Sequence, residues 1–168
     1  MRFPGRLISL QLALVLSGFA GLAYQTSWTR MLHRVFGVGD LAVATVLAAF
    51  SLGLGAGSWL ASRASTRIER PAIVYAMLEG LVAAYAAASP WVVPAIGSAY
   101  VAVGADASPE LLSLWRLALS LAVLVPPALL LGATLPVVAL LPTEPGKWAS
   151  GVTGLYVSNT VGAVLGAG

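Results

Sequence analysis

Residues 41–62 read LAVATVLAAFSLGLGAGSWLAS and carry no charged side chain over 22 positions. A helix needs about 20 apolar residues to cross a hydrocarbon core of about 30 Å, so this stretch is long enough for one crossing. A strand of a membrane barrel would instead alternate apolar and polar residues over about ten positions. No such alternation occurs, and the stretch therefore predicts a membrane-spanning α-helix.

The rest of the chain repeats this pattern. Only 9% of the 168 residues are charged, against about 25% in a soluble domain, which excludes a soluble globular fold. The charges separate four more uncharged windows, 7–29, 80–105, 117–143 and 148–168. We expect one all-α integral membrane domain over residues 1–168, a polytopic bundle of about five transmembrane helices. Their expected positions are near 7–25, 41–62, 72–94, 112–140 and 150–168.

The composition also limits the chemistry. The chain has no Cys and a single His, at position 33, which excludes disulfide scaffolds, thiolate metal sites and His-rich metal sites. No phosphate loop, nucleophile elbow or HExxH zinc motif occurs. We therefore expect no catalytic residue, no metal and no cofactor. The Arg residues are scattered between apolar runs, so we expect the lipid bilayer rather than nucleic acid as a partner.

The distribution of Lys and Arg predicts the orientation. Six of them flank the windows on the side of the N-terminus and three on the other side, so the N-terminus is expected in the cytoplasm, in a bacterial inner membrane. A cleaved signal peptide is the alternative, with Arg2 and Arg6 preceding an apolar run and Gly18-Phe19-Ala20 as the cleavage site. The apolar run continues past Ala20, which favours an uncleaved helix.

Residues 26–36 form an amphipathic pattern after the first window. Arg30, His33 and Arg34 lie on one helical face. The opposite face is apolar and comprises Trp28, Met31, Leu32, Val35 and Phe36. The pattern predicts a short interfacial helix anchored by Trp28, which either caps the first span or docks lipid headgroups or a partner. The simpler role, as a cap, is favoured, with His33 as a solvated residue.

Proline interrupts two of the predicted spans. Pro90 and Pro94 lie where the third helix is expected to stop. Pro126 and Pro127 lie in the middle of the fourth, where they remove two backbone donors. The fourth helix is therefore expected either to kink or to break in two, and broken helices build substrate sites in some transporters. A kink is the favoured interpretation.

Small residues recur every four positions in two windows. They are Gly53, Gly57 and Ala61 in the second, and Gly154, Ser158, Gly162 and Gly166 in the fifth. Such faces let helix backbones approach closely in lipid, where packing drives association. The spacing predicts tight helix contacts, either within the chain or with another chain.

A few polar residues lie inside the predicted spans, where they are candidates for function. Glu79 is the one acid within a span, and Asn159 and Thr134 are expected at a similar depth, with Gln11 shallower. A shared intramembrane polar site for a proton or cation is therefore geometrically possible. The favoured interpretation is that Glu79 is neutral or hydrogen-bonded and only joins helices, because burial disfavours its charged form.

Several segments, in order along the chain, resemble the spermidine synthase-like integral membrane proteins, also described as fused transporter-like/spermidine synthase proteins. The segments are 17–32, 35–37, 44–50, 52–58, 131–136 and 154–166. The resemblance implies a membrane module, which in that family precedes a soluble aminopropyltransferase-like domain. These 168 residues contain no counterpart of that domain, so the resemblance implies no enzymatic activity here.

Three functions follow as hypotheses. The first is a scaffold, interaction subunit or membrane anchor that packs its small-residue faces against other membrane-protein subunits. The second is a transport or cation- or proton-binding module built around Glu79. The third is the membrane fragment of a polyamine (spermidine) synthase-like enzyme.

Overall fold

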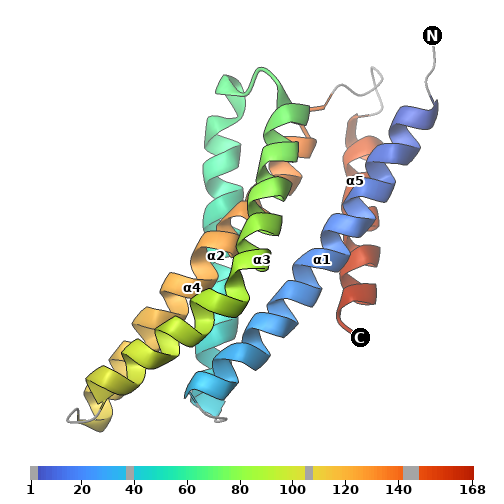
Figure 1. Ribbon diagram of the computed structural model, residues 1–168. Helices are drawn as coiled ribbons and strands as arrows, with labels where there is room; N and C mark the ends of the chain where they lie inside the picture. The colour runs from blue at the N-terminus through green and yellow to red at the C-terminus, as the bar shows by residue number, and fades with distance from the viewer. Residues whose placement is uncertain (1–3, 37–39, 105–107, 142–147) are drawn as a thin grey trace.

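The computed structural model describes residues 4–36, 40–104, 108–141 and 148–168. All regular structure in these ranges is helical, as predicted. The five α-helices are α1 (Pro4–Phe36), α2 (Asp40–Ala64), α3 (Pro71–Gly104), α4 (Pro109–Val138) and α5 (Trp148–Gly166), with a short 3-10 helix, η1 (Ser65–Arg67), after α2. Successive α-helices run in opposite directions (Figure 1), so α1 is parallel to α5 and α2 is parallel to α4.

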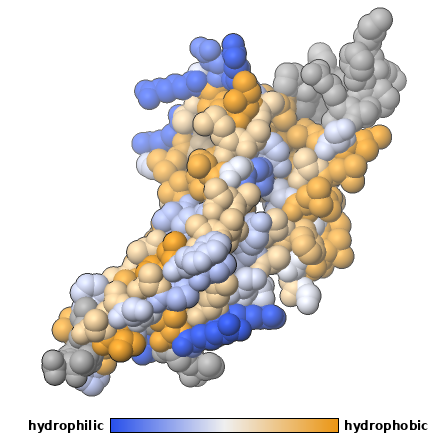
Figure 2. All heavy atoms as spheres, viewed as in Figure 1, coloured by the Kyte–Doolittle hydropathy of each residue, from blue (hydrophilic) through white to orange (hydrophobic). Residues whose placement is uncertain are grey.

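The surface of the bundle suits a membrane. Helices α1 to α4 each contain a window long and apolar enough to cross one, and many of their large apolar side chains are exposed. Figure 2 shows a largely hydrophobic surface whose most hydrophilic residues lie mainly toward its two ends. The chain is therefore a helical membrane protein. Helix α5 has 19 residues, or about 28 Å of rise, and a fifth crossing stays a prediction.

The predicted interfacial segment 26–36 is instead the last part of α1, which runs without a break to Phe36. The amphipathic pattern was identified correctly, but its apolar face contacts protein. Trp28 and Leu32 are fully buried in the largest core cluster. The ring of Trp28 stacks on Tyr24 and meets Tyr85 edge-on, with both centroid distances at 5.6 Å. Burial against neighbouring helices therefore replaces the predicted contact of Trp28 with the membrane interface.

The prediction that the third helix ends near Pro94 is also wrong, because α3 continues to Gly104 with both prolines inside it. Proline at position 90 leaves the carbonyl of Ala86 without its helical donor. The Ser89 hydroxyl donates to that carbonyl over 2.8 Å. The rings of Pro90 and Pro94 are themselves exposed.

Helix α4 likewise passes through Pro126-Pro127 as one helix, so the alternative of two pieces is wrong. Pro127 removes the donor to the carbonyl of Val123. The phenol of Tyr85, on α3, donates to that carbonyl over 2.7 Å. A hydrogen bond between helices thus compensates one of the two donors that the proline pair removes, and it joins α3 to α4.

Candidate functional site

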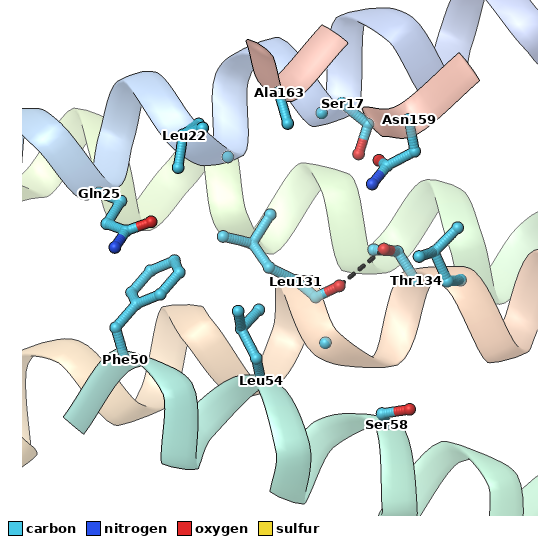
Figure 3. A pocket seen from close by; sticks show the side chains of 14 residues that line it. Ser17, Leu22, Gln25, Phe50, Leu54, Ser58, Leu131, Thr134, Asn159 and Ala163 are labelled. Carbon is cyan, nitrogen blue, oxygen red and sulfur yellow. Dashed lines mark hydrogen bonds between the residues drawn. The ribbon is translucent and has the colours of Figure 1, made fainter. Parts of the chain in front are cut away.

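A cavity of about 310 Å³ lies between the α1–α5 pair and the α2–α4 pair. Five polar side chains line it, Ser17, Gln25, Ser58, Thr134 and Asn159. Figure 3 shows Ser17, Thr134 and Asn159 grouped at one end and Gln25 beside Phe50 at the other. Leucines on α1, α2 and α4 complete the wall. The cavity therefore has a polar end and a more apolar end.

Glycines bring the paired helices close enough to form this wall. A methyl group added at Gly57 would overlap the carbonyl of Leu129, and one at Gly132 would overlap the carbonyl of Leu54. The same holds between α1 and α5, where a methyl group at Gly162 would overlap the carbonyl of Val15. Only hydrogen fits at these positions.

The residues of the predicted small faces lie at contacts within the chain. Gly53 and Gly57 face α4, and Gly162 and Gly166 face α1. Ala61 is buried against α3 and α4, in a cluster with Ala133 and Val137. The other two predicted positions, Gly154 and Ser158, also lie on α5. A methyl group at Gly154 would meet Gln11 at 3.6 Å, an ordinary contact distance. The hydroxyl of Ser158 donates to the carbonyl of Gly154 over 2.9 Å.

The glycines on the opposing helices, Gly18 and Gly132, were missed by the sequence reasoning. A methyl group at Gly18 would overlap the carbonyl of Asn159. Gly18 has no small residue four positions away and Gly132 has only Ala128, so neither belongs to a run like those in the second and fifth windows.

Glu79 lies behind one wall of the cavity rather than in it. The hydroxyl of Ser17, a buried residue of α1, donates to the Glu79 carboxylate over 2.5 Å. The phenol of Tyr75 lies near both side chains and donates to the carbonyl of Ala13 over 3.5 Å. Ser17 is therefore both part of the cavity wall and a direct partner of Glu79.

No other charged residue lies within eight positions of Glu79 in the sequence. The windows of α1, α2, α4 and α5 that form the bundle contain none. Among the described residues, no Lys, Arg or His forms an ion pair with Glu79. Within the described ranges the carboxyl group thus has one hydroxyl partner, Ser17, and no counter-ion, which is unusual for an acid inside a membrane span.

The four predicted members of the polar site have different positions. Thr134 and Asn159 line the cavity, and Glu79 reaches it through Ser17. Gln11 does not line it and instead lies beside Gly154 between α1 and α5. Sequence reasoning missed Ser17, Gln25, Ser58 and Tyr75, whose only signal was a polar atom inside an apolar window.

The predicted interfacial side chains do not gather at this site. Arg30 and Arg34 are exposed near the far end of α1. The Nε2 atom of His33 is buried without a hydrogen-bond partner among the described residues. Arg116, near the same end, donates to the hydroxyl of Tyr100 over 3.0 Å, so it is occupied away from Glu79.

The described residues contain no group of three His, Cys, Asp or Glu side chains that would hold a metal ion. No family model, curated protein or solved structure matched the chain. Interpretation of the site therefore rests on its geometry, and membership of the spermidine synthase-like membrane family stays a prediction.

Proposed function

We propose that this protein is a membrane transport module that binds a proton or small cation at Glu79 and admits it through the adjoining cavity. The observation that carries the proposal is an intramembrane carboxyl group that is hydrogen-bonded to the cavity wall and has no basic partner in the described chain. A carboxylate without a counter-ion is costly in a membrane, so it favours binding a proton or a cation. The module would carry no catalysis of its own.

The lining of the cavity supports a hydrated or polar occupant at one end. Three helices besides α1 contribute a polar side chain there, with Ser58 on α2, Thr134 on α4 and Asn159 on α5. Ordinary helix packing needs no such convergence, and buried polar groups persist where they are hydrogen-bonded or functional. A purely adhesive role for Glu79 would be met by its bond to Ser17 alone, without an open cavity beside it.

The charge of the cavity can be tested because the chain contains no Cys. Ala163 lines the cavity, so Ala163→Cys places one thiol on its wall. Its reaction with two methanethiosulfonates, one carrying trimethylammonium and one carrying sulfonate, is timed by mass spectrometry in proteoliposomes. The preference for the cationic reagent is expected to be about tenfold greater at this thiol than at a thiol outside the cavity, because a nearby carboxylate attracts one charge and repels the other.

Adding Glu79→Gln should lower the ratio of the two rates to that of a thiol outside the cavity, whereas Glu69→Gln, at an exposed acid outside the helices, should leave the preference in place. A Val157→Cys thiol on an exposed part of α5 supplies the ratio for a thiol outside the cavity. An unchanged preference in Glu79→Gln would remove Glu79 from the site.

An interaction subunit is the second candidate, and it now depends on a different surface. The small-residue faces are used inside the chain. The outer side of α5 instead offers an apolar groove, lined by Tyr156, Val157, Thr160, Val161, Val164 and Leu165. A membrane helix of another subunit is the occupant this candidate requires. Purification in mild detergent after cross-linking tests it, and recovery of an uncross-linked monomer would contradict it.

We also propose a cytoplasmic N-terminus in a bacterial inner membrane. Thr66 and Ser108 are exposed at opposite ends of the bundle. In intact cells, an impermeant thiol reagent should label Ser108→Cys and leave Thr66→Cys unlabelled. The reverse result would invert the orientation.

A further inference from the structure

Ser17 is the one described side chain that both lines the cavity and bonds to Glu79. It is 6% exposed and comes from α1, whereas Glu79 comes from α3. Any influence of Glu79 on an occupant through hydrogen bonds must therefore pass through this hydroxyl. The orientation of the Ser17 hydroxyl therefore determines which hydrogen-bonding group this residue presents to the cavity.

A serine hydroxyl has one hydrogen to donate and two lone pairs to accept with. When Glu79 is ionised, the hydrogen of Ser17 points at the carboxylate, so only lone pairs remain for the cavity. The neighbouring Thr134 is in the same condition, because its hydroxyl donates to the carbonyl of Leu131 over 2.7 Å. Because both hydroxyls donate elsewhere, they can only accept hydrogen bonds from an occupant of the cavity.

Protonation of Glu79 reverses this arrangement at Ser17. A neutral carboxyl group has its own O–H, which can donate to the Ser17 oxygen. The Ser17 hydrogen is then released and turns toward the cavity by rotation about the Cβ–Oγ bond. One proton is added to Glu79, Ser17 neither gains nor loses one, and no heavy atom has to move.

We propose that Ser17 transmits the protonation state of Glu79 to the cavity. With Glu79 ionised, the hydroxyls of Ser17 and Thr134 offer only acceptors beside the Asn159 amide, and they favour an occupant with N–H or O–H donors. With Glu79 protonated, Ser17 becomes a donor and that preference is lost. The inference rests on the proposed function, since it requires that Glu79 take up and release a proton.

Other titratable groups do not provide this link. Tyr75, one turn before Glu79 on the same helix, is the titratable neighbour that the structure places beside both side chains. The facing parts of α1, α2, α4 and α5, within windows 7–29, 41–62, 117–143 and 148–168, contain no charged residue. The state of Ser17 therefore follows Glu79, with Tyr75 as the titratable neighbour of both.

The test compares two cationic reagents at the Ala163→Cys thiol in the full chain in proteoliposomes. Methanethiosulfonates carrying ethylammonium and ethyltrimethylammonium have the same charge, but only the first has N–H donors. The ratio of their rates reports donor preference, whereas the trimethylammonium-to-sulfonate ratio reports charge. Because each is a ratio at one thiol, the reactivity of that thiol cancels.

Ser17→Ala should lower the donor preference about tenfold, as expected for loss of a hydrogen bond to a charged group, and leave the charge preference intact. Ser17→Thr, which keeps the hydroxyl, should retain both preferences. Ser58→Ala makes the same chemical change on another wall of the cavity and should change the donor preference less than Ser17→Ala does.

Glu79→Gln should lower the donor preference too, because its amide can donate to Ser17. Adding Ser17→Ala to Glu79→Gln should then cause no further change in the donor preference. Transmission by Ser17 is overturned if Ser17→Ala leaves the donor preference of the Ala163→Cys protein unchanged. It is also overturned if Ser17→Ala and Glu79→Gln lower that preference additively. The proposed function fails by a different result, namely a charge preference that survives Glu79→Gln.

Discussion

The hydrogen bond from Tyr85 to the carbonyl of Val123 gives the fold its most specific prediction. Tyr85→Phe removes only the hydroxyl and keeps the ring that meets Trp28 edge-on. Hydrogen bonds between membrane helices average about 0.6 kcal/mol and reach about 1.7 kcal/mol, because a released group usually finds another partner. This carbonyl has lost its helical donor to Pro127, and Val123 is 1% exposed. We therefore expect a loss near the upper end, about 1.5 kcal/mol.

A second substitution isolates the cause. Pro127→Ala restores an N–H at the position that normally donates to the Val123 carbonyl. In that background Tyr85→Phe should cost about 0.5 kcal/mol or less, which gives a coupling energy of about 1 kcal/mol between the two positions. The free energy of unfolding of the four proteins is measured by titrating mixed micelles with sodium dodecyl sulfate and following helicity by circular dichroism. An equal cost of Tyr85→Phe in both backgrounds would refute the explanation.

Two further predictions concern packing. A methyl group at Gly57 would overlap the carbonyl of Leu129, whereas nothing lies within 4 Å of one at Gly55. In the same titration, the free energy of unfolding of Gly57→Ala should therefore be about 1–3 kcal/mol lower than that of Gly55→Ala. Equal stabilities would contradict the close contact of α2 with α4. Trp28→Ala should lower the free energy of unfolding by about 3–5 kcal/mol, because Trp28 is 1% exposed. Trp91→Ala, at a side chain 75% exposed, should lower it far less. Similar losses would place Trp28 at the membrane interface instead of in the core.

The spacing of charged residues was sufficient to predict the number and order of the helices. It worked because a charge inside the hydrocarbon core is costly, so uncharged windows coincide with helices. Glu79, the one acid within a predicted span, was for the same reason identifiable as a candidate. These inferences depend on local composition alone.

The lengths of α1 and α3 could not be predicted in this way. Pro90 stops a helix only if the carbonyl it releases stays unpaired, and Ser89 pairs it. The apolar face around Trp28 fits an interface as well as a core, and Tyr85 on another helix decides between them. Tertiary partners thus determine what a local pattern means.

The partners of the candidate site were equally hidden from the sequence. The four-residue repeats predicted close contacts, but only the complementary Gly18 and Gly132 show that these form within the chain. The role of Ser17 depends on α1 lying against α3, which no spacing along the chain reveals. Gln11, chosen for its depth alone, lies at the α1–α5 contact instead.

Charge movement through Glu79 tests the central claim most directly. Proteoliposomes containing the purified chain are adsorbed on a solid support, and currents are recorded after jumps in proton, sodium or potassium concentration. The wild-type chain and Glu69→Gln should give a current for at least one of these ions, and Glu79→Gln should give none. A Glu79→Gln current equal to that of the wild type, or a wild-type chain silent to all three ions, would contradict the proposed transport function.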